Sequence, residues 1–577
     1  MCGIIGYVGS QKASHVITEG LKRLEYRGYD SVGIAVRDGN SLNVKKDKGM
    51  VEEVSNSLDF VSIGGTIGLG HTRWATHGAV CKANSHPHAD CKNSIILAHN
   101  GVIENFVELK HELEKKGHKF ASETDSEIIA HLLEDGIKSK TMLESFLSSL
   151  KRLEGSYAIV AMTSAGEEKL FVARRNSPLV IGVGKGEMLC ASDIPAMLKH
   201  TKTFVPLEEG DVAVLSRDGY NIYSLEGAEV TRKQITVDWG LDIAQKGGYP
   251  HFMLREINDQ KHFINESLAS DVTEGKKLID QHSRIDIVAA GTSYHAGLML
   301  SYLLSQTGKS AQAFIASDYS FVAKPNKDTL MVVITQSGET ADVLQAMRFA
   351  DKCKKLAITN TVGSSVTRLA DCTILMNSGP EIGVAATKTF TSQLAVIFKL
   401  VFPKEKLSNL SQIISQMLEQ EDAIKKIAPT LVAKENVFFI ARGGNVPIAY
   451  EASLKFKEIT YIHSEAYPGG ELKHGTLSLI TNGVPVIVLA PSDATLSKLF
   501  GNLKEAKARG GTILSITNDD SIKNESDFSI PLPKNIDPIL YPFALIVPLQ
   551  LLAYHVSVLR GINPDRPRNL AKSVTVE

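Results

Sequence analysis

The sequence is poor in the features that mark secreted, membrane-spanning and nucleic-acid-binding proteins. Only six cysteines occur in 577 residues, and they are scattered at Cys2, Cys81, Cys91, Cys190, Cys353 and Cys372. This is not a disulfide scaffold, so we predict reduced thiols in a cytoplasmic protein. The 63 basic and 64 acidic residues leave a net charge of -1, which predicts no general attraction for nucleic acid or an anionic membrane.

Long uninterrupted apolar runs are also missing. The most apolar segment, FALIVPLQLLAYHVSVL (543–559), is interrupted by Pro548, Gln550 and His555. It is too short and too polar to span a bilayer, and we interpret it as a buried helix. The first ten residues have neither the basic region nor the apolar stretch of a signal peptide.

The chain is too long for one hydrophobic core, and its pattern changes along its length. Up to about residue 215, short β-branched runs alternate with helical patterns, which is typical of an α+β domain. Residues 216–260 are polar and irregular and resemble a linker. We therefore predict a first domain over 2–215.

Beyond the linker, strand–turn–helix patterns occur twice. RIDIVAAGTSYHAG is echoed by ENVFFIARGGNVPI, and KKLAITN by GTILSITND, at offsets of 152 residues (Gly291 to Gly443) and 158 residues (Asn360 to Asn518). Two correspondences in the same order favour an internal duplication of an α/β unit with a parallel sheet. The predicted units span 275–412 and 427–568, and 569–577 is a C-terminal tail.

The chain opens MCGIIGYVGS, with a cysteine directly behind the initiator methionine. If Met1 is removed, a thiol and an α-amine, with ordinary pKa values of about 8.5 and about 7.7–8.0, lie on one residue. The amine can then act as the base for the thiol. The alternative is an inert cysteine in a frayed terminus.

Three further segments of the first domain carry polar residues suited to chemistry. GLGHTRWATHG contains Arg73, Trp74 and His77, and ILAHNGVIEN places Asn100 and Gly101 after a β-like run. A side-chain amide and a backbone N–H there can point at one oxyanion. In SETDSE, Asp125 lies at a predicted helix start. Taken singly, each has an ordinary explanation: a turn, a core arginine or an N-cap.

Together with YRGYDS (26–31), these segments resemble the cysteine-type N-terminal-nucleophile glutamine amidotransferases. The resemblance implies Cys2 as nucleophile and Asn100 with Gly101 as oxyanion hole. It also implies that Arg73 and Asp125 hold the α-carboxylate and α-amine of L-glutamine. Further residues expected at this substrate site are Arg27, Trp74, Thr76 and His77, with Trp74 gating an ammonia channel.

A metal site is the competing interpretation of one loop. CKANSHPHADC offers Cys81, His86, His88 and Cys91 within eleven residues. The spacing matches no common zinc pattern. We therefore predict no metal and interpret the segment as a histidine-rich loop near the glutamine site.

Two loops in the first α/β unit are suited to binding a phosphate. VVITQSGETADVLQAM (332–347) and AAGTSYHAG (289–297) each lead from an apolar run through hydroxyl residues into a helix. Hydroxyls and free N–H groups at a helix N-terminus bind anions, although capping alone also explains them. No P-loop lysine pattern is present, so we favour a sugar phosphate over a nucleotide.

The second unit supplies acid–base groups. Glu451, Lys455 and Glu458 recur at i, i+4 and i+7, which places them on one helix face, and His474 follows in GELKHG. A solvated ion-pair stripe has the same spacing. A carboxylate beside a lysine and a histidine is also what aldose–ketose isomerisation requires.

These loops, the EASLKFKE helix, ELKHG and the terminal LAKSVTVE resemble paired sugar-isomerase (SIS) domains. The resemblance implies that Glu458 moves a proton between C1 and C2 of the sugar, that Lys572 forms an imine assisted by Lys455, and that His474 opens the ring from the neighbouring subunit. The residues implied in phosphate and sugar binding are Thr292, Ser293, Thr335, Gln336, Ser337, Thr340, Val384 and Glu451. The chain departs from the bacterial pattern at Ala290 (commonly Cys) and Thr335 (commonly Ser), and Thr retains the hydroxyl.

The two resemblances together imply an enzyme that converts fructose 6-phosphate and L-glutamine to glucosamine 6-phosphate and glutamate. They imply no cofactor and a homodimer. Another sugar phosphate as acceptor is the alternative, and a non-catalytic sugar-phosphate sensor is the least favoured. An imine requires an unprotonated amine, so we expect Lys572 to be partly buried or beside another cation, for which Lys455 is a candidate.

Overall fold

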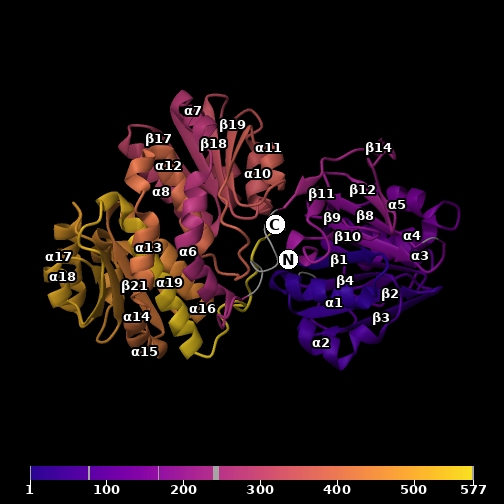
Figure 1. Ribbon diagram of the computed structural model, residues 1–577, viewed down its shortest axis with the longest axis horizontal. Coiled ribbons are helices and arrows are strands. Elements are labelled where there is room, and N and C mark those ends of the chain that lie inside the picture. The colour runs from indigo at the N-terminus through magenta and orange to yellow at the C-terminus, as the bar shows by residue number, and fades with distance from the viewer. Residues whose placement is uncertain (1, 76–77, 167, 238–245, 575–577) are drawn as a thin grey trace. The chain divides into compact units, whose positions relative to one another are not determined.

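The computed structural model in Figure 1 describes residues 2–75, 78–166, 168–237 and 246–574. The chain forms two compact units, one of Met1–Ala244 with Ser573–Glu577 and one of Gln245–Lys572. Each unit has its own sheets and its own hydrophobic cores.

The first unit is built on two stacked sheets that are antiparallel wherever their strands pair. In spatial order, the first sheet contains β15 (Ile235–Thr236), β11 (Thr203–Pro206), β9 (Val180–Val183), β10 (Met188–Ala191), β1 (Gly3–Val8), β4 (Ile67–Arg73), β2 (Ser31–Asp38) and β3 (Ser41–Lys48). The second contains β14 (Glu229–Val230), β13 (Gly219–Tyr223), β12 (Val212–Ser216), β8 (Leu170–Arg175), β7 (Gly155–Thr163), β6 (Ile95–Ile103) and β5 (His88–Ala89). The helices are α1 (Ala13–Leu24), α2 (Val51–Ser57), α3 (Phe106–Lys115), α4 (Glu127–Gly136) and α5 (Met142–Leu150).

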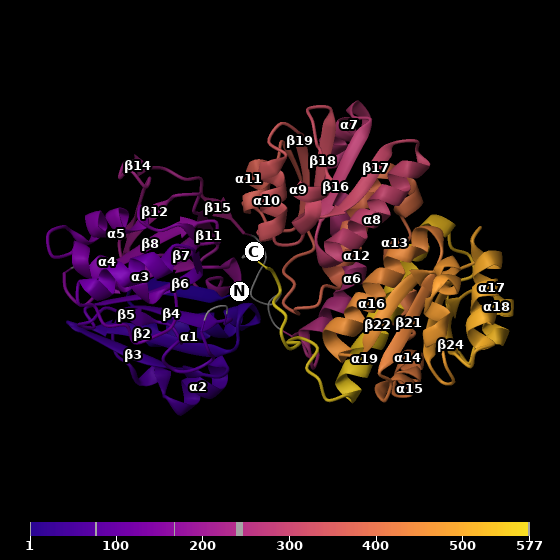
Figure 2. The same ribbon diagram turned by 180° about the vertical axis from the view of Figure 1, so that it is seen from behind.

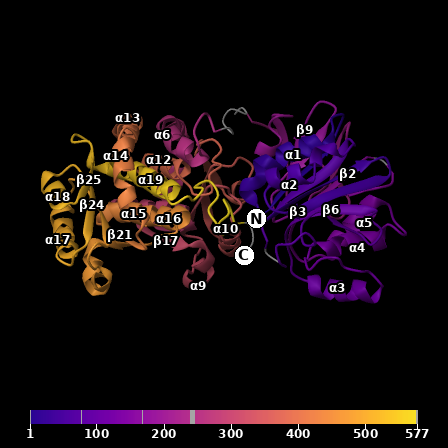
Figure 3. The same ribbon diagram turned by 90° about the horizontal axis from the view of Figure 1, so that it is seen from below.

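The alternation of side chains along β1 explains the layers. Ile4 and Val8 face the second sheet, whereas Ile5 and Tyr7 face α1, because successive strand residues point to opposite faces. Helices α1 and α2 thus cover the first sheet and α3–α5 cover the second (Figure 3). The result is a helix–sheet–sheet–helix architecture, and its α+β class is as predicted.

One local prediction differs from the structure. Strands β13, β14 and β15 lie within 216–260, where the sequence suggests an irregular linker, and α6 begins at Phe252. These strands are short and mostly half-buried, so their sequences carry little hydrophobic alternation from which a strand could be predicted.

The second unit contains two five-stranded sheets in which every pairing is parallel. The first is ordered β17 (Ser310–Ile315), β16 (Arg284–Ala289), β18 (Thr329–Thr335), β19 (Lys354–Thr359) and β20 (Cys372–Leu375). The second is ordered β22 (His463–Pro468), β21 (Asn436–Ala441), β23 (Pro485–Ala490), β24 (Thr512–Thr517) and β25 (Phe528–Pro531). Their helices are α6 (Phe252–Ala269), α7 (Thr273–Gln281), α8 (Gly291–Gln306), α9 (Tyr319–Val322), α10 (Ala341–Phe349), α11 (Ser365–Leu369), α12 (Lys388–Val401), α13 (Leu410–Leu418), α14 (Glu421–Ile427), α15 (Pro429–Val432), α16 (Val446–Thr460), α17 (Leu496–Lys507), α18 (Asp520–Glu525) and α19 (Tyr541–Leu559).

The two sheets repeat one topology, which we call the first and second repeat. In each, the strand order is second, first, third, fourth, fifth. Gly291 and Gly443 follow the first strand of their repeats with φ of 54° and 56°, and Asn360 and Asn518 follow the fourth. Both sequence correspondences therefore fall at equivalent places in the fold, which supports the predicted duplication.

One hydrophobic core joins the two repeats. It contains residues of β16, β21, α6, α8, α12, α16 and α19, and α16 packs against α19 (Figure 2). Among the described residues, one helical stretch, Pro538–Leu559, is long and apolar enough to cross a membrane, and 83% of its most apolar window is buried. The prediction of a buried helix over 543–559 is confirmed.

Candidate active sites

The Cys2 thiol lies at the start of β1, next to the end of β4. Gly3 pairs with Thr72, so Cys2 is brought beside Arg73 and Trp74. The Trp74 N–H donates to Cys2 Sγ at 3.2 Å, and Sγ is 3.4 Å from the Trp74 carbonyl oxygen. Burial raises the pKa of the thiol, and the Trp74 N–H and the positive charge of Arg73 act against that rise.

Asn100 and Gly101 lie beside this thiol on β6. Asn100 Nδ2 donates to the Cys2 carbonyl oxygen at 2.9 Å, and its Oδ1 is 3.0 Å from His71 Nε2, which fixes the amide orientation. Gly101 has φ 129°, and a Cβ there would lie 2.0 Å from the Ser156 carbonyl oxygen. Only glycine fits at that position.

The two residues expected to hold glutamine, Arg73 and Asp125, are both buried. Arg73 donates to the carbonyl oxygens of Gly78 and Ala79 at 3.4 and 3.2 Å. Asp125, two residues before α4, accepts from the Ile103 N–H on β6 at 2.8 Å. Asp125 is thereby anchored to the strand that carries Asn100 and Gly101.

The other predicted residues of this site are only partly placed. Arg27 forms a 2.9 Å ion pair with Asp193, and the Trp74 ring meets Tyr29 edge-on with centroids 5.4 Å apart. Thr76 and His77 lie outside the described residues.

The histidine-rich loop packs beneath the Cys2 site. His86 stacks on His71 with ring centroids 4.0 Å apart, and His88 Nε2 is 3.1 Å from Thr124 Oγ1. Burial, with Arg73 nearby, lowers the pKa of His71 to about 3, and burial also lowers the pKa of His86 and of His88 well below its usual value, so these rings are neutral. Cys91 does not join them and lies instead among residues of α4 and the α3–α4 loop.

In the second unit, the predicted phosphate loops lie at one sheet edge. They follow β16 and β18, which are neighbouring parallel strands, so their carboxyl ends meet. Thr335 Oγ1 accepts from the Gly338 N–H at 3.3 Å and is 3.4 Å from Thr340 Oγ1, and Thr340 is the N-cap of α10. Ser337 Oγ accepts from the Glu339 N–H at 3.2 Å. The Gln336 carbonyl oxygen accepts from Asn360.

The hydroxyls of Thr292 and Ser293 have partners on other helices. Gln393 Nε2 donates to Ser293 Oγ at 2.8 Å. Thr292 Oγ1 donates to Glu451 Oε1 at 3.0 Å and accepts from Lys455 Nζ at 3.1 Å. A loop of the first repeat is thus joined to the acid–base helix of the second.

Glu451, Lys455 and Glu458 lie on one face of α16, as their spacing predicts. Lys455 Nζ is 3.3 Å from Glu451 Oε1 and 2.5 Å from Glu458 Oε2, and Glu451 Oε2 is 2.7 Å from His295 Nδ1. Glu451 and Lys455 are fully buried, whereas the Glu458 side chain is 19% exposed. The alternative of a solvated stripe is therefore excluded.

The electrostatics of this face suit proton transfer by Glu458. Burial acts to lower the pKa of Lys455, but the two carboxylates outweigh it and raise that pKa, so the lysine stays charged. Burial raises the pKa of Glu458 above the ordinary carboxyl value, and Lys455 opposes that rise. A carboxyl group with a raised pKa can exchange protons nearer neutral pH.

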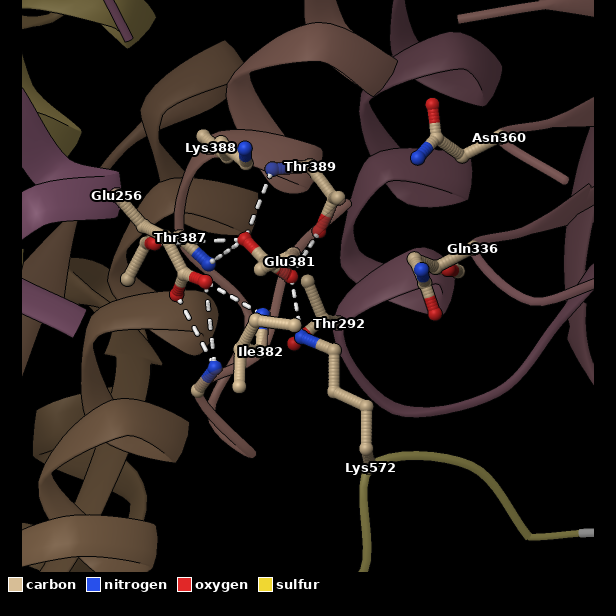
Figure 4. A network of polar contacts seen from close by, with 12 residues as sticks. Glu256, Thr292, Gln336, Asn360, Glu381, Ile382, Thr387, Lys388, Thr389 and Lys572 are labelled. Atoms are coloured by element: carbon tan, nitrogen blue, oxygen red, sulfur yellow. Dashed lines mark hydrogen bonds and ion pairs between the residues drawn. The ribbon is translucent and has the colours of Figure 1, made fainter. Parts of the chain in front are cut away.

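Lys572 is partly buried, which is one of the two alternatives predicted, but its amine pairs with a carboxylate and not with a cation. Figure 4 shows its Nζ directed at Glu381, with which it forms a hydrogen-bonded ion pair. Only 5% of the Lys572 side chain is exposed, and none of Glu381. Lys455, the cation expected beside it, is bonded instead to Glu451, Glu458 and Thr292.

Glu381 and its neighbours are residues that the sequence reasoning missed. Glu381 accepts from the Thr387 and Thr389 N–H groups at 2.9 and 3.1 Å (Figure 4). Although burial opposes it, the charge of Lys572 helps lower the pKa of Glu381 to about 2. Glu256, nearby on α6, has its pKa raised to about 8 by burial and by the charge of Glu381. The available signal was the charged pair Glu381 and Lys388 in PEIGVAATKTF, inside an otherwise uncharged run.

Two further predicted residues lie apart from these contacts. Val384 is buried, and its N–H donates to the Asp565 carbonyl oxygen at 3.2 Å. His474 is exposed at the end of the short helical segment Gly469–His474. Among the described residues, no hydrogen bond or ion pair links it to Glu458.

The fold and the two sites define a class: a glutamine amidotransferase domain followed by a pair of SIS domains. The family model described as "Glutamine amidotransferase domain" matches residues 71–199, and the model described as "SIS domain" matches 277–401 and 430–560. A solved structure titled C-terminal domain of glucosamine-fructose-6-phosphate aminotransferase, from Francisella tularensis, is 35% identical with a TM-score of 0.53. It covers 56% of this chain and all of that one.

Full-length relatives specify the family further. A glutamine–fructose-6-phosphate aminotransferase (isomerising) of Pyrococcus horikoshii is 47% identical over 601 residues, and one of Aquifex aeolicus is 41% identical over 594 residues. Each alignment covers the whole of both chains. The chain belongs to the glutamine–fructose-6-phosphate aminotransferase (isomerising) family.

Proposed function

We propose that the chain converts D-fructose 6-phosphate and L-glutamine to D-glucosamine 6-phosphate and L-glutamate. The observation that carries this proposal is the bonding of Thr292 to both Glu451 and Lys455. It brings the hydroxyl loops of the first repeat to the acid–base face of the second. A chain that also carries the half-buried Cys2 thiol can supply ammonia to a sugar phosphate held there.

The glutaminase half-reaction follows from the contacts of Cys2. The thiolate attacks the side-chain amide of glutamine, and the α-amine of Cys2, once Met1 is removed, takes the thiol proton and passes it to the departing ammonia. The Asn100 amide and the Gly101 N–H stabilise the oxyanion of the tetrahedral intermediate. Arg73 and Asp125 hold the α-carboxylate and α-amine. Water then hydrolyses the thioester and releases glutamate.

The sugar half-reaction uses the second unit. The loops at Thr292–Ser293 and 335–340 hold the phosphate, and Lys572 forms an imine at C2 with loss of water. Ammonia then replaces the lysine at C2. Glu458 removes a proton from C1 and returns one to C2, which converts the 2-imine into the 2-amino aldose.

The ion pair with Glu381 bears on when Lys572 can form the imine. The Nζ group of Lys572 is held in the ion pair with Glu381, and it must leave that contact before it can attack a carbonyl. We infer that sugar binding must separate this ion pair, or draw its proton away, before the imine forms. The lysine is thereby kept unreactive until a sugar is present.

The assembly and partners are part of the same proposal. His474 is exposed on its own chain, so a role in ring opening requires a second copy to present it, and we propose a homodimer. The partners are then the two small-molecule substrates, in the cytoplasm, with no organic cofactor.

A product assay tests the proposed function. The full-length chain is incubated with glutamine and, separately, with fructose 6-phosphate, fructose 1-phosphate and ribulose 5-phosphate, and the amino sugars are identified by mass spectrometry. Glucosamine 6-phosphate from fructose 6-phosphate alone is expected. Amination of a different sugar phosphate in preference would establish the alternative acceptor, and no amino sugar from any of them would overturn the proposal.

A further inference from the structure

Four side chains of the first unit converge at a place remote in sequence from Cys2. Cys91 follows β5, His118 follows α3, and His131 and Glu134 lie one turn apart on α4. One ligand atom from each lies within 4.8 Å of all the others. His118, His131 and Glu134 are buried, and Cys91 is exposed.

The distances between these atoms fit a common centre. Cys91 Sγ is 3.7 Å from His118 Nδ1 and 3.5 Å from His131 Nδ1, and Glu134 Oε2 is 3.0 Å and 3.4 Å from the same two nitrogens. Zinc bonds nitrogen and oxygen ligands at about 2.0–2.2 Å and thiolate sulfur at about 2.3 Å. A tetrahedron with those radii has edges of roughly 3.3–3.7 Å. Three of the four distances fall in or at this range, and the fourth is shorter by a few tenths of an ångström.

The far nitrogens of both histidines face carboxylates. His118 Nε2 is 3.1 Å from Asp135 Oδ1, and His131 Nε2 is 3.6 Å from Glu127 Oε1. Metal-ligating histidines commonly present their other ring nitrogen to a carboxylate in this way, which fixes the ring and the tautomer. At 3.6 Å the second contact is too long for a direct hydrogen bond, and His131 Nε2 is buried without one.

Ion pairing alone explains less of this arrangement. Without a metal, the two ring nitrogens of His118 would simply contact Glu134 and Asp135. That leaves unexplained why His131 also turns Nδ1 to the same Glu134 oxygen, and why the Cys91 sulfur lies against both nitrogens. One cation among the four atoms would account for all of these contacts.

We propose that Cys91, His118, His131 and Glu134 bind one zinc ion in a structural site. One thiolate, two imidazoles and one carboxylate complete a tetrahedron with ligands typical of zinc, and four protein ligands leave no open position for catalysis. The site differs from the Cys81–Cys91 loop considered from the sequence, because only Cys91 belongs to both. Its other ligands come from α4 and the loop before it.

The position of the site gives the metal a consequence for glutamine binding. The ion would join the β5–β6 turn, the end of α3 and the first turns of α4. Asp125 lies just before α4 and faces β6 through Ile103. Fixing α4 therefore fixes the segment that presents Asp125, so metal loss is expected to raise the glutamine KM more than it lowers kcat.

Metal analysis of the full-length chain tests the proposal. The chain is purified in the presence of Zn²⁺ and then dialysed exhaustively. We expect one zinc ion per chain by inductively coupled plasma mass spectrometry. Exchange for Co²⁺ should give the intense visible bands of a tetrahedral site and a thiolate-to-cobalt charge-transfer band. Cys91→Ser should lose the charge-transfer band, whereas Cys81→Ser, the matched control, should keep it.

Two outcomes would overturn the zinc site. One is wild-type protein that retains no zinc and gives no tetrahedral Co²⁺ spectrum, which would leave the cluster as a metal-free ion-pair network. The other is a charge-transfer band unchanged in Cys91→Ser, which would place the metal elsewhere. The wild-type arm needs no substitution, so a variant that fails to fold does not spoil the test.

Discussion

The two repeats of the second unit share a topology but have divided the chemistry between them. At the offset of 152 residues that relates Gly291 to Gly443, the hydroxyl pair Thr292–Ser293 of the first repeat corresponds to Gly444–Asn445 of the second. In the other direction, Glu451, Lys455 and Glu458 on α16 correspond to Met299, Leu303 and Gln306 on α8.

At two of these three positions, the corresponding residues of α8 and α16 differ in charge but not in burial. Met299 and Leu303 are buried core residues, whereas Glu451 and Lys455 are equally buried but charged. Buried charges are costly unless they are paired, so their presence in only one copy points to function rather than packing. One repeat carries the hydroxyl loops, the other carries the buried charged face of α16, and Thr292 joins the two.

The largest effect is expected from a substitution in the first unit, at Cys2. It tests whether the two repeats can act on the sugar without the glutamine site. Cys2→Ala should reduce glutamine hydrolysis by more than about 10⁴-fold, the range seen when a covalent nucleophile is removed. Conversion of fructose 6-phosphate to glucose 6-phosphate should persist, because it uses only the repeats. Cys81→Ala is the control, and mass spectrometry of the mature wild type should show Met1 missing. Retained glutamine hydrolysis in Cys2→Ala, or full activity in a chain that keeps Met1, would contradict the assignment.

The next largest effect concerns the residue that follows the second repeat. Lys572→Arg keeps the positive charge beside Glu381 but cannot form an imine, so synthase activity should fall by about 10⁴-fold or more. Glutamine hydrolysis without sugar should be unchanged. Borohydride with fructose 6-phosphate should trap an adduct that peptide mapping places on Lys572.

An adduct on another lysine would refute the imine assignment. Glu381→Gln sharpens the test. It removes the negative charge that pairs with Lys572 Nζ, so the borohydride-trappable reaction of Lys572 with simple aldehydes should become faster. A rate equal to that of the wild type would contradict the inferred restraint.

Glu458→Gln removes one carboxyl group from the charged face of α16 in the second repeat. It introduces glutamine, the residue found at the corresponding position, Gln306, of the first repeat. Isomerisation should fall by about 10²–10⁴-fold, the usual contribution of a general acid–base group, while fructose 6-phosphate binding is kept. Because the pKa of Glu458 is raised, its carboxylate form is lost as pH falls through a value above the ordinary 4.5. The acidic limb of the wild-type profile should therefore lie above that value.

Glu419→Gln, at an exposed position outside the face, is the control for this substitution. Unchanged isomerisation in Glu458→Gln, or an acidic limb at or below the ordinary carboxyl value, would count against Glu458 as the proton carrier.

The smallest effect compares equivalent serines of the two repeats. Ser337 and Ser492 each lie two residues after the third strand. Ser337→Ala removes a charge-assisted hydrogen bond to phosphate and should weaken fructose 6-phosphate binding by about 1.5–3 kcal/mol. Ser492→Ala should leave it unchanged. Titration calorimetry measures the fructose 6-phosphate affinity of both variants. A larger loss of affinity in Ser492→Ala would show that the phosphate binds the second repeat and not the first.

Much of this organisation could be predicted from the sequence. Periodicity placed Glu451, Lys455 and Glu458 on one face, and the echoes at Gly291 and Asn360 exposed the duplication. Both signals are local, because they depend on spacing along the chain.

The groups that were missed are brought together by tertiary structure. Glu381 is 191 residues from Lys572, and Cys91 is 27 and 40 residues from His118 and His131. No spacing rule connects such positions. The short strands β13–β15 were missed for a different reason, since their mostly half-buried residues leave no clear hydrophobic pattern.

The central claim, that nitrogen from glutamine reaches a sugar held between the two repeats, is tested most directly by isotope transfer. Glutamine labelled with ¹⁵N in its amide is incubated with fructose 6-phosphate and the wild-type chain, in excess unlabelled ammonium, and the product is analysed by mass spectrometry. Glucosamine 6-phosphate that carries ¹⁵N in nearly every molecule is the predicted result. Product that carries mainly unlabelled nitrogen, or glutamine hydrolysis without any amino sugar, would contradict the account.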